Sequence, residues 1–191
     1  MTHADLVAGT REVVENYWRT RAALRLLVPG HVHGASKLQF EGIPHVGSMT
    51  GLLQNETIAE AHASLGDYAT NRLARDIFVA LIAVFERRLI ARLLATGANT
   101  SGTLGTLQHR IQKLVSLPVD LTEDLDEVRE RRNAQMHQDG QADHKYAAAA
   151  LKVHARYPQY VPAVAFGTLV IPDGKYLTYA ADVLVRYSAA L

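Results

Sequence analysis

The chain has 191 residues and no cysteine, so disulfide bridges, thiolate catalysis and cysteine-based zinc sites are excluded. Hydrophobic residues make up 48% of the chain and charged residues 20%, which is typical of a folded globular protein rather than a disordered one. The net charge of +1 gives no overall basic field, so any contact with a nucleic acid must be local.

A single domain over residues 1–191 is expected, because this length can enclose one hydrophobic core and no linker composition marks a boundary. The start of the chain lacks the basic and then apolar segments of a signal peptide. The longest apolar run, Ile77–Phe85, is roughly half of the ~18 residues that a membrane span needs. We therefore expect a soluble, cytoplasmic protein without a membrane partner.

Apolar periodicity predicts a mostly α-helical chain. A first helix is expected from Ala4 to about Leu27, before Pro29-Gly30. Residues 29–55 show no helical period and predict an irregular connection, which in a compact domain is often functional. A short helix is predicted over Glu56–Ser64, and a long central helix over Tyr68–Ala95.

The second half of the chain continues the helical pattern. Asp120-Leu-Thr-Glu123 has the form of a capping box, which predicts a helix from about Leu121 that ends at Gly140. Pro172-Asp-Gly174, between Ala165–Ile171 and Lys175–Thr178, predicts a small C-terminal β-hairpin. Three further helices are expected over Leu104–Leu117, Asp143–Arg156 and Tyr179–Ala190.

The helix predicted from Leu121 to Gly140 places an arginine in an apolar stripe. On a helical wheel the apolar stripe consists of Leu121, Leu125, Val128 and Met136, with Arg132 in its middle. A second, polar stripe consists of Asp126, Glu130, Asn133 and His137. A buried arginine is costly unless it is paired or opens onto a cleft or subunit interface. Arg132 and His137 lie about 140° apart on this wheel.

An arginine and a histidine together suit the cleavage of RNA without a metal. The reaction needs a group that removes the proton of the 2′-hydroxyl and a group that stabilises the extra negative charge on the phosphorus. Histidine exchanges protons near neutral pH, and arginine binds phosphate oxygens with a planar fork. This chemistry suggests His137 as the acid or base, Arg132 as the phosphate ligand and Asn133 as a group that orients the imidazole or binds the ribose.

The segment Arg132-Asn133-Ala-Gln-Met-His137 resembles the Arg-polar-(three residues)-His signature of the HEPN superfamily. The apolar helix with Phe85-Glu86-Arg-Arg-Leu is similar to that family's earlier core helix. The resemblance implies an α-helical bundle that dimerises, so that two Arg/His pairs face one composite cleft. Many members are metal-independent endoribonucleases of toxin–antitoxin, antiphage or CRISPR-linked systems, and others are non-catalytic binding modules.

For this chain the resemblance implies a homodimeric endoribonuclease that acts on RNA as a toxin or antiphage effector, without metal or cofactor. A cognate antitoxin or regulatory protein is a further candidate partner. Glu86, Glu130 and Asp126 are expected to support the site, and Arg129 and Arg131 to contact RNA. Gln138-Asp139 follows His137, in place of the tyrosine that marks the HEPN subgroup silenced by nucleotide transfer.

Other interpretations of the same residues remain open. Arg132 could be a buried arginine paired with an acid such as Glu86, and His137 a solvated histidine at a helix end. The chain could then be a non-catalytic module that binds RNA, a nucleotide or a protein, or a dimer whose interface Arg132 organises. His31, His33 and His45 could suggest a metal site, but only Glu41 offers a nearby carboxylate, and loop histidines are commonly solvated.

Overall fold

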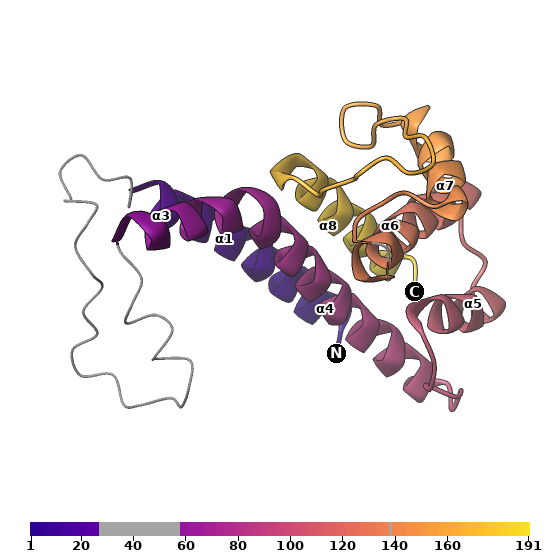
Figure 1. Ribbon diagram of the computed structural model, residues 1–191. Helices are drawn as coiled ribbons and strands as arrows, with labels where there is room; N and C mark the ends of the chain where they lie inside the picture. The colour runs from indigo at the N-terminus through magenta and orange to yellow at the C-terminus, as the bar shows by residue number, and fades with distance from the viewer. Residues whose placement is uncertain (27–57, 138) are drawn as a thin grey trace. The chain divides into compact units, whose positions relative to one another are not determined.

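The computed structural model describes residues 1–26, 58–137 and 139–191, and helices dominate this part of the chain (Figure 1). The predicted mostly α-helical character is therefore confirmed for the described residues. The chain divides into two compact units, one of Met1–Trp18 with Ala74–Leu191 and the other of Arg19–Leu73. The connection expected at 29–55, with its three histidines, lies outside the described residues.

The smaller unit holds the end of α1 (His3–Leu26), α3 (Ile58–Asp67) and a short π-helix, η1 (Tyr68–Arg72). The π-helix continues directly into α4 (Leu73–Ala95), so the two helices expected in this region follow one another without a break. Arg72 Nε lies 3.7 Å from an Asp67 carboxylate oxygen, and both side chains are exposed. An exposed pair of this kind contributes little to stability.

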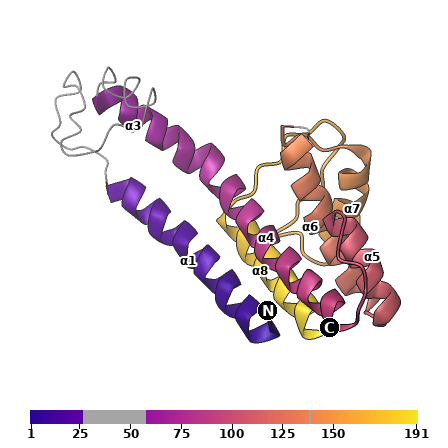
Figure 2. The same ribbon diagram turned by 90° about the horizontal axis from the view of Figure 1, so that it is seen from below.

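Two long helices, α4 and α8 (Gly174–Ala189), form the core of the larger unit. Figures 1 and 2 show them side by side. The ring of Phe78 meets Tyr176 edge to face at a centroid distance of 5.4 Å, and Phe85 meets Tyr187 in the same way at 5.7 Å. All four side chains are buried, so their contacts combine apolar burial with favourable ring geometry.

The first part of α1 packs on these two helices. His3 Nδ1 lies 3.1 Å from the hydroxyl oxygen of Ser188 on α8. A Cβ added to Gly174 would lie only 2.7 Å from the ring of Trp18, so glycine permits the close approach of α1 to the start of α8. Among the described helices, none is both long and apolar enough to cross a membrane.

The predicted C-terminal hairpin is wrong. Lys175–Thr178, expected as its second strand, lies inside α8. The Asp173 carboxylate accepts a hydrogen bond from the backbone N–H of Tyr176 at 2.7 Å, so the residues read as a β-turn cap a helix instead. Burial of Tyr176 and Leu177 against the bundle overrides their strand propensity.

Two shorter helices, α5 (Leu104–Leu114) and α7 (His144–His154), start where the sequence pattern predicted. Each begins with a side-chain cap. The hydroxyl of Thr103 accepts from the N–H of Thr106, and the carboxylate of Asp143 accepts from the N–H of Tyr146. Both helices end a few residues before the predicted boundary. Helix α5 ends at Leu114, after which the backbone of Val115 is extended, and α7 ends at His154.

The motif helix, α6 (Val119–His137), starts two residues earlier than predicted. The proposed capping box does not form, because Glu123 is turned toward α7. Its carboxylate accepts a hydrogen bond from Arg156 at 2.8 Å and lies 3.4 Å from Lys152 Nζ. The hydrogen bond from Arg156 lowers the pKa of Glu123. Pro118, the residue just before the helix, accepts the first backbone bond from Thr122.

The inner face of α6 buries an ion pair. Arg131 is only 2% exposed, and its Nε donates to Glu127 Oε1 at 3.2 Å. Tyr176 donates its hydroxyl proton to the other oxygen of Glu127 at 3.0 Å. The guanidinium carbon of Arg131 lies 3.5 Å from the centre of the Tyr176 ring and 5.4 Å from that of Tyr146. Helices α6, α7 and α8 therefore meet at one charged cluster.

The charges in this cluster depend on one another. Burial raises the pKa of Glu127, while Arg131 and the Tyr176 hydroxyl oppose this shift. Burial alone would lower the pKa of Arg131, but Tyr176 and Glu127 raise it by more, so the guanidinium stays charged. Burial also raises the pKa of Tyr176 well above its usual range, which keeps its hydroxyl a donor.

A second ionic cluster joins the same three helices near the start of α6. Asp124 is buried, and its carboxylate accepts from Arg156 on α7 at 2.8 Å and from Arg186 on α8 at 3.3 Å. Arg186 is also bound by Asp182, one turn earlier on α8. Because Asp124 forms ion pairs with α7 and α8, and Glu127 accepts a hydrogen bond from Tyr176 of α8, the rotation of α6 about its own axis is fixed.

Replacing Glu127 with alanine is expected to lower the free energy of unfolding by about 3–5 kcal/mol, because it leaves the buried guanidinium of Arg131 unpaired. The matched control is Asp182→Ala. Asp182 and Arg186 have the same four-residue spacing on a helix, but their side chains are 61% and 39% exposed, so we expect a loss of about 0–1 kcal/mol. Urea unfolding of the two variants measures both values, and equal losses would show that burial does not determine the effect.

Candidate functional site

The Arg132–His137 motif occupies the last turns of α6, as predicted. The helix ends at His137, and the chain reverses through Asp139 (φ +50°) and Gly140 (φ +83°). The N–H of Gly140 donates to the carbonyl of Ala134 at 3.0 Å. Glycine suits this position because its backbone is in the left-handed region.

The predicted burial of Arg132 in the middle of the apolar stripe is wrong. Leu121, Leu125 and Val128 are buried as expected, but Met136 is 44% exposed and Arg132 is only half-buried. The fully buried positions on the last turns belong to Arg131 and to Gln135, whose side-chain amide donates to the carbonyl of Val170. A wheel of apolar residues cannot show this, because Arg131 and Gln135 are buried with polar partners, Glu127 and the carbonyl of Val170.

The three arginines of α6 have different surroundings. Arg129 binds Asp126 and Glu130, with its Nη1 2.9 Å and its Nη2 2.8 Å from their carboxylate oxygens. Arg131 is held by Glu127 in the core. Arg132 makes no hydrogen bond or ion pair within the described residues, and its Nε is buried. The motif arginine is therefore the cation of this helix that is left without an anion.

The two arginines expected to contact RNA are held inside the protein. Arg131 is buried and cannot reach a phosphate in this structure, so that prediction is wrong. Arg129 is half-buried, and two carboxylates offset its charge; its Nη1 also donates to the side-chain oxygen of Gln108 on α5. Asp126 and Glu130, which were expected to support the site, thus form ion pairs with Arg129.

Asn133 and His137 lie on the outer side of α6. The Asn133 amide donates to Glu130 Oε2 at 3.2 Å, which fixes the side chain one turn before His137. His137 is exposed at the helix end. Glu130 links Asn133 to Arg129, which also binds Asp126, so three of the four residues of the predicted polar stripe are joined in one network.

Glu86, on α4, is half-buried and makes no hydrogen bond or ion pair within the described part of the chain. It does not hold Arg132. The alternative in which these two residues form a buried pair is therefore wrong for this structure, and the acid that pairs with a buried arginine is Glu127 instead.

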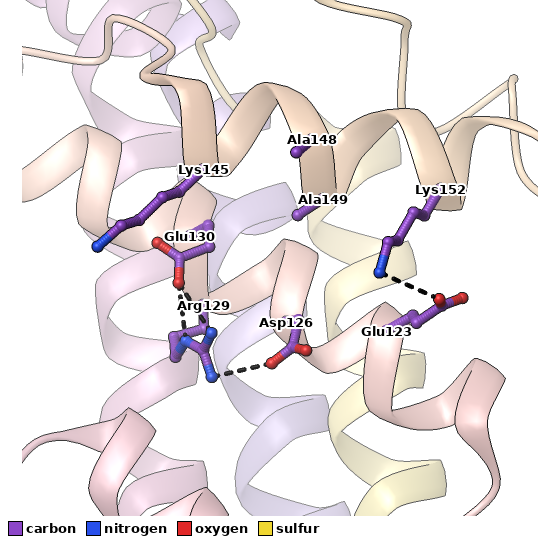
Figure 3. Close-up of a pocket in the computed structure, with 8 residues that line it drawn as sticks. All are labelled: Glu123, Asp126, Arg129, Glu130, Lys145, Ala148, Ala149 and Lys152. Atoms are coloured by element: carbon purple, nitrogen blue, oxygen red, sulfur yellow. Dashed lines mark hydrogen bonds and ion pairs between the residues drawn. The ribbon is translucent and has the colours of Figure 1, made fainter.

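A cleft of about 310 Å³ lies between α6 and α7, next to the outer face of the motif helix (Figure 3). Its lining carries both signs of charge. Figure 3 shows Arg129 between Glu130 and Asp126, and Lys152 pointing to Glu123. Lys145 also lines the cleft, but it has no ion pair within the described residues. Lys145 is therefore a second cation on this side of the protein with no internal anion.

Arg75 of α4 is a part of the site that the sequence did not reveal. Its Nη2 donates to the backbone carbonyl of Gln135 at 2.5 Å, between Arg132 and His137 in the chain. The last carbonyls of a helix have no partner inside the helix, so the guanidinium caps the end of α6. Sixty residues separate the two groups in sequence, and no local pattern links them.

The site combines an unpaired guanidinium, an exposed imidazole and a fixed amide on one helix end. Such groups can bind an anion and transfer a proton. The described residues contain no cluster of three or more histidine, aspartate or glutamate side chains placed to hold a metal ion. Comparison of the chain with protein-family models, curated proteins and solved structures finds no match.

Replacing Arg75 with alanine is expected to lower the free energy of unfolding by about 1–2 kcal/mol, because a carbonyl at the end of α6 loses a charged donor. Backbone amides at the end of α6 should also exchange hydrogen faster. Arg87→Ala is the control, since Arg87 is exposed on the same helix and unpaired within the described residues. Hydrogen exchange that is equally slow in both variants would contradict the capping role.

Proposed function

We propose that this protein is a metal-independent endoribonuclease of HEPN type that acts as a homodimer, as a toxin or antiphage effector. The observation that carries the proposal is the unpaired state of Arg132. Arg129 and Arg131 are each bound by carboxylates of α6, whereas the arginine of the motif has no anion in the described structure. A buried, unsatisfied N–H is costly, so a bound phosphate would supply the missing acceptor.

The exposed position of His137 supports the second half of the proposal. An imidazole at the surface can reach a substrate hydroxyl, and Asn133 next to it on the polar stripe is held by Glu130. Asn133 is thus available to bind the ribose or to orient the imidazole with its carbonyl oxygen. A histidine buried in the core would lack this access.

The reaction follows from these groups. His137 removes the proton of a 2′-hydroxyl, and the 2′-oxygen attacks the adjacent phosphorus. Arg132 stabilises the additional negative charge of the phosphorane. The bond from phosphorus to the 5′-oxygen then breaks, and that oxygen takes up a proton from a protonated imidazole. The products are a 2′,3′-cyclic phosphate and a 5′-hydroxyl.

A dimer would bring a second motif to the site. Arg132 and His137 are five residues apart on α6, which separates them by about 140° around the helix and about 7.5 Å along it. One straight helix therefore does not aim both side chains at one phosphate. Two copies related by a twofold axis would place the arginine of one near the histidine of the other.

RNA cleavage in the presence of a chelator is expected for the purified protein. His137→Ala and Arg132→Ala should each lower kcat by at least about 100-fold, because each removes a group that acts in the transition state. The products should carry a 2′,3′-cyclic phosphate. The matched controls are His109→Ala on α5, whose side chain is exposed, and Arg87→Ala on α4.

The same variants separate the nuclease from a non-catalytic binding module. Expression of the parent chain in cells should arrest growth, and His137→Ala should relieve the arrest at equal protein level. Full RNA cleavage by His137→Ala would exclude the proposed role of this residue. RNA binding without cleavage by the parent, and unaffected growth, would support the binding module instead.

Sedimentation velocity is expected to show a dimer at the concentrations at which the protein cleaves RNA. The loss of cleavage on dilution should follow the loss of dimer, because the proposed site needs both copies. His109→Ala should behave as the parent protein. A monomer that cleaves RNA at the full rate would contradict the composite site but leave the roles of Arg132 and His137 to be tested separately.

A further inference from the structure

A surface aromatic pair lies in the chain that follows the motif helix. The rings of His144, the first residue of α7, and Phe166, in the connection to α8, stack at a centroid distance of 4.3 Å and an interplanar angle of 12°. Phe166 is 65% exposed. One face of its ring is covered by the imidazole, so the exposed surface of the pair includes a flat aromatic face.

The position of Phe166 is fixed by backbone hydrogen bonds. Thr168 N–H donates to the carbonyl of Ala165, which closes a turn around Phe166, and Gly167 has the φ of +79° that the third residue of a type II turn requires. The N–H of Gly167 donates to the carbonyl of Ala142, and the N–H of Ala142 donates to the carbonyl of Thr168, both at 2.8 Å. These backbone hydrogen bonds therefore fix the turn that carries the ring of Phe166.

The same hydrogen bonds join this turn to the end of α6. Leu169 pairs with Gln141 in an antiparallel bridge, and Val170 N–H donates to the carbonyl of Gly140 at 2.8 Å. Gln135 donates its side-chain amide to the carbonyl of Val170. These bonds place the turn that carries Phe166 next to the end of α6, the helix that carries His137.

We propose that Phe166, backed by His144, is a stacking site for an unpaired base of single-stranded RNA. This inference rests on the proposed nuclease function and adds the kind of RNA bound. Proteins bind single strands with exposed aromatic rings on which bases stack and with cations that contact the backbone. Lys145, the residue after His144, is exposed and has no ion pair within the described residues, so it can contact the backbone of that strand.

A base is a better occupant than an apolar protein surface. The ring of Phe166 is backed by an imidazole and has an unpaired lysine nearby, whereas the core of a protein interface is depleted of charge. A duplex would not fit this site, because its bases are stacked inside the helix and cannot reach the ring.

The test measures the binding of a fluorescein-labelled adenosine oligoribonucleotide of about ten nucleotides, a length within the span of single-strand sites. The full chain carries His137→Ala, which prevents turnover. In this background Phe166→Ala should weaken binding roughly tenfold, the effect of losing one stacked base. Phe166→Trp should keep the affinity. Leu151→Ala is the matched control, because Leu151 is an apolar side chain of α7 that is 64% exposed, as Phe166 is, but has no ring to stack on a base.

Equal affinity of Phe166→Ala and its parent would overturn the stacking site. The same holds if the oligonucleotide annealed to its complement shows the same Phe166 dependence, or if Phe166→Ala changes only self-association, which would indicate a protein contact. Thermal unfolding of each variant verifies the fold.

Cleavage assays on chains with His137 intact separate this inference from the proposed function. If the parent protein cleaves RNA and Phe166→Ala binds RNA as tightly as its parent, the stacking site is excluded and the nuclease proposal stands. If binding depends on Phe166 but no variant cleaves RNA, the stacking site stands and the nuclease is excluded. If the protein neither binds nor cleaves RNA, both proposals are excluded.

Discussion

The buried ion pair between Arg131 and Glu127 determines how the motif helix is presented. The two residues are one turn apart on α6, and Tyr176 of α8 closes the pair by donating to Glu127 while its ring lies against the guanidinium. The pair can be buried only with Arg131 directed at α8. Arg132 is the next residue, about 100° further around the helix, and is therefore turned away from the cluster. The burial of one arginine leaves its neighbour partly accessible.

Ion pairs also explain why the low net charge is a poor guide to the surface of this protein. Most acids of α6 are used internally: Glu123 and Asp124 bind Arg156, Glu127 binds Arg131, and Asp126 and Glu130 bind Arg129. Lys152 also pairs with Glu123 and Arg186 with Asp124, so five cations face these five acids. Arg132 and Lys145 are left without internal anions in the described residues, on α6 and α7. A chain with a charge of +1 can thus present a local cationic site.

Much of the fold could be predicted from apolar periodicity, since α1, α4, α5, α7 and the end of α6 lie close to their expected positions. The errors arose where a polar side chain had two available roles. Asp173 was read as part of a β-turn but caps α8, and Glu123 was read as a cap but binds Arg156. Arg132 was assigned the buried position that Arg131 holds. Glu123 pairs with Arg156 of α7, and the cap at Asp173 and the burial of Arg131 both depend on Tyr176 of α8 packing in the core, which no local pattern identifies.

The sequence predicts less of the candidate site than of the fold. A motif identifies Arg132 and His137 because they lie within six residues, but their surroundings come from distant segments. Arg75 caps the helix end from sixty residues away, and the turn that carries Phe166 is tied to Gly140 and Ala142 by backbone bonds. With few free cations, the proposed RNA-binding surface has little electrostatic attraction for a long phosphate chain. Stacking on Phe166 would then supply much of the affinity, and it would favour strands whose bases are unpaired.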